Sequence, residues 1–234
     1  MKRLMIAGAL AFAAAGQALA ADLPQPAPPP PEAPAAYIPT VAPVYNWGGI
    51  YFGVNGGYGL GKSSWVIPGV GTTADFNTNG FLVGGTLGAN YQVDAFVFGI
   101  EGDFDGSWLD GNISDPNCAA SFGGACETKN NWLSTVRARV GYAADRVLFY
   151  GTGGGAFGNI VEGTNGAATS TFASKTVAGW TAGAGIEAAF ADNWTARVEY
   201  LFVDFSNATF TTGVAPTVKL DANLVRLGVD YKFR

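Results

Sequence analysis

From residue 46 onward, apolar residues alternate with polar or small residues in eight segments of the chain. A period of two is typical of β-strands, because successive side chains of a strand point to opposite faces of the sheet. The pattern predicts an all-β protein. Its expected strands cover residues 48–59, 79–92, 96–108, 132–143, 147–158, 176–190, 194–205 and 224–234.

The connections between these strands are alternately short and long. Three-residue turns, each with an aspartate at its centre, are predicted at Asp94, Asp145 and Asp192. Long polar loops are predicted over residues 60–78, 109–131, 159–175 and 206–223. This arrangement is typical of a transmembrane β-barrel with short periplasmic turns and long extracellular loops. Residues 46–234 are therefore predicted to form an eight-stranded antiparallel up-and-down barrel.

Charged residues in the predicted strands lie on the face opposite the apolar residues. Arg137 and Arg139, for example, alternate with Val136, Ala138 and Val140. Five strand cations facing lipid at ~2–4 kcal/mol each would cost ~10–20 kcal/mol, as much as the whole stability of a typical domain, ~5–15 kcal/mol. The charged face is therefore predicted to line the lumen. The predicted luminal network consists of Glu101, Asp103, Arg137, Arg139, Glu187, Arg197, Glu199, Arg226, Asp230 and Lys232.

This predicted network holds five acids and five bases. An eight-stranded barrel has an interior just wide enough for its own side chains, so the charges are expected to pair and close the lumen. A soluble, lipocalin-like barrel would place its apolar face inside. The charges opposite continuous aromatic-rich faces disfavour that alternative.

Aromatic residues near the strand ends predict two belts at the membrane interfaces. Trp47 is assigned to the belt on the short-turn side, and Trp108 and Trp180 to the other belt. Asp204 has the parity of a lipid-facing residue, and it is expected at the depth of the lipid headgroups.

The beginning of the chain differs from the rest in composition. Lys2 and Arg3, the apolar run that follows, and Ala18-Leu19-Ala20 predict a secretory signal peptide over residues 1–20, with Ala18 and Ala20 forming the cleavage motif. Residues 21–45 are rich in proline and predict an extended periplasmic segment. A spacer is the preferred interpretation of this segment, and contact with peptidoglycan is the alternative.

Composition narrows the class of partner. Only 13% of the 234 residues are charged, about half the fraction usual in soluble domains, which indicates a surface that does not face water everywhere. Removing Lys2 and Arg3 from the 13 basic residues leaves 11 against 18 acidic residues, a net charge of −7. Nucleic acid is therefore not an expected partner.

Candidate chemistry is sparse. Cys118 and Cys126 lie in one polar stretch of an exported chain and predict a disulfide. The chain has no histidine, which excludes Ser-His-Asp and Cys-His catalysis, and no enzyme activity, metal or cofactor is expected. Gly153, Gly155 and Gly158 have the spacing G-x-G-x-x-G, but a dinucleotide site would require them to open a helix. They lie within a predicted strand instead.

The two ends of the mature chain resemble a known family. The stretches WGGIYFGVNGGYG (47–59), ADLP (21–24) and NLVRLGVDYKF (223–233) are similar to the first strand, the mature start and the final strand of the alphaproteobacterial 25/31-kDa outer-membrane protein family. The resemblance implies an eight-stranded barrel in the outer membrane of a Gram-negative bacterium, related to OmpA-type barrels but without a peptidoglycan-binding domain behind it. Outer-membrane lipid and lipopolysaccharide would surround it.

The resemblance also implies how the protein is assembled. Members of this family usually end on an aromatic residue that the barrel-assembly machinery is thought to read. Here Phe233 is followed by Arg234, and Phe233 has outward parity. The assembly signal is therefore carried over to Val229, Tyr231 and Phe233, with periplasmic chaperones and the barrel-assembly machinery as the implied partners.

Three functions are compatible with these features. The preferred one is a structural protein that contributes to envelope integrity and presents its loops at the cell surface. A narrow porin for small solutes is the first alternative, although a pore that selects ions would more naturally show an imbalance of luminal charge. A surface adhesin or receptor is the second, with the loop 109–131 and the nearby Trp108 and Phe122 as its candidate surface.

Overall fold

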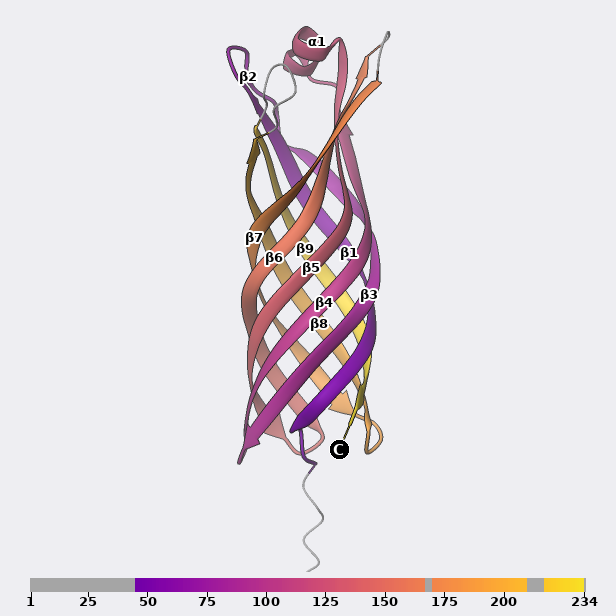
Figure 1. Ribbon diagram of the computed structural model, residues 1–234, viewed down its shortest axis with the longest axis vertical. Coiled ribbons are helices and arrows are strands. Elements are labelled where there is room, and N and C mark those ends of the chain that lie inside the picture. The colour runs from indigo at the N-terminus through magenta and orange to yellow at the C-terminus, as the bar shows by residue number, and fades with distance from the viewer. Residues whose placement is uncertain (1–44, 167–169, 210–216, 234) are drawn as a thin grey trace, which may run out of the picture. The chain divides into compact units, whose positions relative to one another are not determined.

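A computed structural model describes residues 45–166, 170–209 and 217–233 (Figure 1). These residues belong to one compact unit, Ala42–Arg234. The predicted signal peptide with Ala18 and Ala20, and the proline-rich segment up to residue 44, lie outside the described residues.

Eight long strands form a closed antiparallel barrel, which confirms the predicted fold class. Each long strand pairs with the long strands next to it along the chain, and β1 also pairs with β9, which closes the sheet. The strands are β1 (Gly49–Ile67), β3 (Phe76–Val93), β4 (Phe96–Ile113), β5 (Gly124–Ala144), β6 (Val147–Gly166), β7 (Ser170–Ala189), β8 (Trp194–Thr209) and β9 (Thr217–Lys232). Two short elements, β2 (Gly71–Thr72) and α1 (Pro116–Phe122), lie in the connections that follow β1 and β4.

The two ends of the barrel differ as predicted. The short turns and the last residues of β9 lie at one end, and α1 and β2 lie at the other (Figure 1). Asp94 and Asp145, at the centres of two short turns, have φ angles of 51° and 52°. Aspartate tolerates this left-handed conformation because its short side chain can bond to the local backbone. The one described helix is too short to span a membrane.

The strands extend further than the sequence pattern predicted. The prediction of a continuous loop over residues 109–131 is wrong at both ends, because β4 continues to Ile113 and β5 already begins at Gly124. Only the stretch around α1 lacks strand pairing there. The barrel therefore continues well past the segments in which apolar residues face outward.

Inward and outward positions keep alternating along the strands, but the chemical character of the two faces changes toward the α1 end, which explains this difference. In the lower part of β1, Phe52 and Val54 point outward and Asn55 is buried inside. Further along the same strand Lys62 is exposed, whereas Trp65 and Ile67 are buried inside the barrel. A strand with a polar outer face resembles a polar loop in sequence, because its apolar residues are confined to the inward positions.

Two rows of aromatic side chains bound the outward apolar band. The row near the short turns includes Tyr91, Phe96, Tyr142, Phe149, Trp194 and Phe233, and the row nearer α1 includes Tyr58, Phe81, Trp108, Trp132, Trp180 and Phe202. Beyond the second row outward residues such as Lys62 are polar, although Leu60 and Val66 also face outward. Asp204 lies there, paired in register with Trp180 on β7 and Asp221 on β9. The band between the rows is the surface expected to contact hydrocarbon.

Candidate functional site: the barrel lumen

All ten charged residues predicted to line the lumen are buried inside the barrel. Arg137 of β5 lies at the centre of this set, with 1% of its surface exposed. Its Nη1 donates to Glu199 Oε1 at 2.9 Å, its Nη2 donates to Asp103 Oδ2 at 2.9 Å, and Nη2 also contacts the Glu101 carboxylate. One guanidinium therefore joins carboxylates from β4 and β8 across the lumen.

A second arginine extends the network toward the α1 end. Arg226 Nη2 donates to Glu199 Oε2 at 2.6 Å, and its Nη1 donates to Asp105 Oδ2 at 2.8 Å. Asp105 is fully buried and was missed by the sequence analysis. The signal was present, because Asp105 follows Glu101 and Asp103 at the same two-residue spacing on β4. With Asp105, and with Glu162 buried nearer α1, the described part of the barrel interior holds seven buried acids instead of the predicted five.

Toward the short-turn end, Glu101 receives further partners. Arg197 Nη1 lies 2.5 Å from Glu101 Oε2, and the Tyr51 hydroxyl donates to the same oxygen at 2.6 Å. Arg139 Nη2 donates to Glu187 Oε2 at 2.6 Å, and its Nη1 donates to the Tyr51 hydroxyl at 2.9 Å. We call these residues, with Arg137, Arg226 and their partners above, the charge network.

Two tyrosines belong to the charge network although sequence reasoning did not select them. Tyr51 bridges Arg139 and Glu101, and the Tyr150 hydroxyl donates to Glu199 Oε1 at 3.1 Å. Glycines on the adjacent strands provide space for both rings. A Cβ on Gly88 would collide with the Tyr51 ring, and a Cβ on Gly185 would lie 2.5 Å from the Tyr150 hydroxyl. These glycines thus make room for large inward neighbours.

Asp230 and Lys232 lie at the margin of the charge network. Asp230 is buried and reaches it through Arg197 Nε, 3.5 Å from Asp230 Oδ2. Lys232 instead reaches the short-turn mouth of the barrel, where its Nζ donates to the Asn46 carbonyl and lies 4.2 Å from the Tyr45 ring centre. The prediction that Lys232 is inward holds for its burial, but its contacts belong to the mouth.

The mouth at the short-turn end is filled by the residues that precede β1. Trp47 is 1% exposed, and its ring meets that of Tyr45 edge to face at 4.9 Å between centres. The Trp47 indole N–H donates to the Asp145 carbonyl at 3.0 Å, and its backbone N–H donates to Gln92 Oε1 at 2.6 Å. The assignment of Trp47 to the outer aromatic belt is therefore wrong, because the chain turns into the barrel before β1 begins. We call residues 45–47 the stopper.

Apolar side chains fill the lumen between the charge network and α1. Fully buried residues there include Trp65, Leu82, Ile160, Leu201 and Val218, and we call this cluster the upper core. Gly158, the last glycine of the G-x-G-x-x-G pattern, lies in β6 beside it. A Cβ on Gly158 would lie 2.7 Å from the Phe205 ring. This glycine therefore serves packing inside a strand, and the pattern marks no nucleotide site.

The α1 end is held together by a disulfide and by capping contacts. Cys118 in α1 is bonded to Cys126 in β5, and both are fully buried. The Asp115 carboxylate caps α1 by accepting from the Asn117 N–H at 2.8 Å and also accepts from the Ala74 N–H at 3.2 Å. The Asn117 side-chain amide donates to the Thr72 carbonyl. The connections after β1 and β4 thus form one joined surface.

Replacing Cys118 and Cys126 with serine is expected to leave the barrel folded and to loosen α1. A crosslink that closes so short a loop stabilises by about 2–3 kcal/mol in the chain-entropy model. Hydrogen exchange should accelerate at the Ala119 and Gly123 amides, which donate to carbonyls of Asp115 and Ala119, and stay unchanged at Val136 in the barrel wall. Unchanged exchange at Ala119 and Gly123 would contradict this role of the disulfide.

The proposed assembly residues lie on the outer face of β9 and just after it. Val229 and Phe233 are exposed, and the Tyr231 ring contacts those of Trp194 and Phe233 at 5.1 and 5.2 Å between centres. The residues of the predicted signal thus form one aromatic-rich patch beside β8. Their reading by an assembly machinery stays a prediction.

Comparison with known proteins identifies the family. Residues 7–233 match the family model described as the outer membrane protein beta-barrel domain. The chain belongs to this family. As an outer-membrane β-barrel protein it resides in the outer membrane, and the location expected from its resemblance is confirmed.

Two relatives of this outer-membrane barrel confirm the resemblance found in its end motifs. The chain is 39% identical to the 31 kDa outer-membrane immunogenic protein of Brucella melitensis biotype 1, over 83% of this chain and 88% of the relative. It is 36% identical to the 25 kDa outer-membrane immunogenic protein of Brucella abortus biovar 1, over 100% of this chain and 99% of the relative. Among solved structures, the outer membrane protease OmpT from Escherichia coli is similar with a TM-score of 0.50 and 9% identity, over 79% of this chain and 97% of that chain, which shows a shared fold alone.

Proposed function

We propose that this protein is a structural, non-enzymatic component of the outer membrane that contributes to envelope integrity and presents its α1 end at the cell surface. The filling of the lumen supports this proposal. The stopper, the charge network and the upper core occupy the interior one after another along its length. A barrel whose interior is filled at three levels spans the membrane without providing a path for solutes.

The charge network favours closure over conduction. Arg137 and Arg226 each bond carboxylates from more than one strand, so these bonds span the lumen. Ions would have to break several charge-assisted hydrogen bonds at once in order to pass. Below the network, the buried rings of Tyr45 and Trp47 fill the mouth, where Lys232 and the Trp47 indole already donate to backbone carbonyls.

The joined surface at the α1 end supports the presentation of an external face. Asp115 and Asn117 connect α1 to the tip that follows β1, and the disulfide fixes α1 to β5. A rigid surface loses less conformational freedom when a partner binds. A receptor or adhesin role would use this surface, and it is compatible with a closed lumen.

The refolded mature protein, residues 21–234, is expected to remain silent in a planar bilayer. Folding is checked beforehand by the heat-dependent shift of barrel mobility on a gel, and insertion by protease protection of the reconstituted protein. A general porin reconstituted in the same way serves as the positive control. Steady open-channel currents from the folded protein would contradict the closed lumen and favour the narrow porin.

Envelope integrity has its own readout in cells. A strain that lacks the protein is expected to become more sensitive to detergent and to large antibiotics, and expression of the full chain should restore resistance. A deletion strain with an unchanged barrier would remove the support for a structural role, even if the bilayer stays silent.

A further inference from the structure

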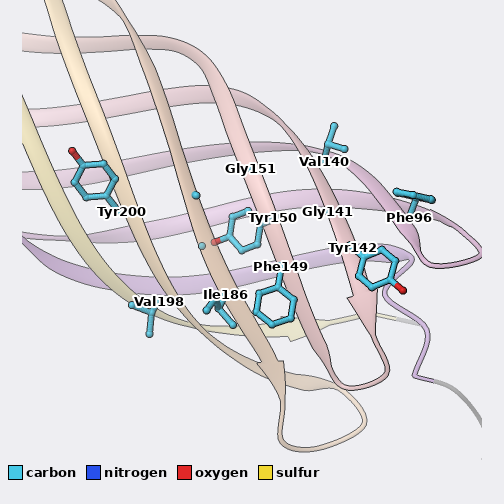
Figure 2. A pocket seen from close by; sticks show the side chains of 12 residues that line it. Phe96, Val140, Gly141, Tyr142, Phe149, Tyr150, Gly151, Ile186, Val198 and Tyr200 are labelled. Atoms are coloured by element: carbon cyan, nitrogen blue, oxygen red, sulfur yellow. The ribbon is translucent and has the colours of Figure 1, made fainter.

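A groove crosses the outer surface of β5, β6, β7 and β8 in the half of the barrel nearest the short turns (Figure 2). Its volume is about 710 Å³, and it is open along its outer side. Its lining is almost entirely apolar. Phe96, Tyr142, Phe149, Ile186, Val198 and Tyr200 form its walls.

The groove exists because two adjacent strands carry small residues at the same depth. Gly151 on β6 is paired with Ala184 on β7. One step toward the periplasm the outward pair is Phe149 with Ile186, which is bulky. Where the small pair replaces bulky side chains, the backbone forms the floor. In a membrane such small residues allow a neighbouring molecule to approach the backbone closely.

The barrel wall below the groove is thin. Tyr150 points inward at this position (Figure 2), with the Arg139 guanidinium 4.1 Å from its ring centre and its hydroxyl bonded to Glu199. Gly141 and Gly185 on the flanking strands carry no side chain that could cover the ring. Beneath the groove, therefore, one strand layer and the Tyr150 ring lie between the outer surface and the charged side chains of Arg139 and Glu199.

The position of the groove in the barrel wall indicates the class of molecule that occupies it. It lies within the outward apolar band, between the two aromatic rows, and therefore faces hydrocarbon. An unfilled groove in this band would lose dispersion contacts along its floor. The convex wall of a second barrel cannot enter a concave groove, whereas a linear acyl chain can follow it.

The charged side chain of Arg146 lies near the periplasmic end of the groove. Arg146 lies in the turn that joins β5 to β6, two residue pairs beyond the Tyr142–Phe149 pair that ends the groove. Its side chain is 50% exposed, forms a long ion pair with Asp192 at 3.6 Å, and has its guanidinium carbon 5.8 Å from the ring centre of Tyr45 at the barrel mouth. A phospholipid whose chain fills the groove from this side would carry its phosphate to the depth of Arg146.

We propose that this groove binds one acyl chain of a phospholipid from the periplasmic leaflet, with the phosphate at the side of Arg146. The bound chain covers the thin wall over Tyr150 and completes the apolar surface of the barrel. This inference depends on the outer-membrane location and not on the structural role proposed above, so either can fail without the other.

The test compares two glycines on the same strand. Gly151 and Gly153 both face outward, and a Cβ would meet only Gly183 O at 3.9 Å and Thr181 O at 3.5 Å, respectively. Gly151 lies in the groove and Gly153 does not. Gly151→Leu therefore fills the groove, while Gly153→Leu adds the same side chain beside it. The heat-dependent gel shift verifies that both variants fold.

The readout is native mass spectrometry of the full mature chain in detergent, titrated with phosphatidylethanolamine. The wild-type protein and Gly153→Leu should each retain one lipid, and Gly151→Leu should bind it at least about tenfold more weakly, as expected when a few methylene groups lose their packing. Equal retention by all three proteins would overturn the proposal. So would retention of a second copy of the chain, or of lipopolysaccharide in preference to phospholipid.

A second measurement locates the chain without any substitution. In nanodiscs, a phospholipid that is spin-labelled on its acyl chain should broaden the methyl signals of Ile186 and Val198 more than those of Val54 on the far side of the barrel. Equal broadening at the three residues would show ordinary surrounding lipid and would overturn the proposal.

Discussion

Replacing Arg137 with leucine is expected to lower the free energy of unfolding by about 3–5 kcal/mol, the usual loss when one partner of a buried charge cluster is removed. The arginine contacts Glu101, Asp103 and Glu199. Without it these carboxylates lose a shared cation while remaining buried. Arg226 and Arg197 can compensate only in part, because each is already bonded to other groups.

The loss is measured by urea denaturation in detergent, followed by tryptophan fluorescence and by the gel shift. Arg146→Leu is the matched control. Arg146 is half exposed and its ion pair with Asp192 spans 3.6 Å, and exposed ion pairs contribute only about 0–1 kcal/mol. Similar small losses for the two variants would show that the charge network contributes little to stability and that the lumen relaxes around the missing cation.

Trp47→Ala is expected to destabilise the protein by about 3–5 kcal/mol, the range for removing a buried aromatic side chain. The indole packs in a cluster with Tyr45, Val97 and Leu148. Its removal leaves a cavity at the short-turn mouth and leaves the Asp145 carbonyl without the indole N–H that it accepts. The stopper should detach from the mouth, because the Trp47 ring is its largest buried group.

Trp194→Ala provides the comparison for this prediction. Trp194 lies at the same end of the barrel, but it faces outward and is 45% exposed, so truncation should cost clearly less. Hydrogen exchange should also accelerate at the Trp47 backbone amide position, which donates to Gln92, in Trp47→Ala alone. Equal losses of stability in the two variants would mean that residues 45–47 do not act as a stopper.

The period of two was sufficient to predict the number and order of the long strands, the closed barrel and the inward face. It assigned Arg137 and Glu199 correctly to the interior because a two-residue alternation is a property of the strand itself. The same rule extended by two residues would have placed Asp105 inside as well. The sequence therefore does contain the signal for Asp105.

The pattern failed where the surroundings of the barrel change. Above the second aromatic row water replaces lipid outside, so polar residues such as Lys62 face outward and apolar residues such as Trp65 fill the interior. Inward and outward positions still alternate there, but polar residues now lie outside and apolar residues inside. A prediction that expects apolar residues outside assigns such a segment to a loop and therefore ends the strands too early.

The composition of the chain and its two-residue alternation were thus enough to establish an outer-membrane barrel with charges inside. Composition and alternation both depend on whether single side chains contact lipid or water. The pairing of each cation with its carboxylates depends on which strand positions face one another across the lumen, and that follows only from the register of the closed sheet. The stopper depends on the path of the chain before β1, and the groove over Tyr150 depends on small residues of adjacent strands meeting at one depth. No local pattern encodes either, so both became visible only in the folded barrel.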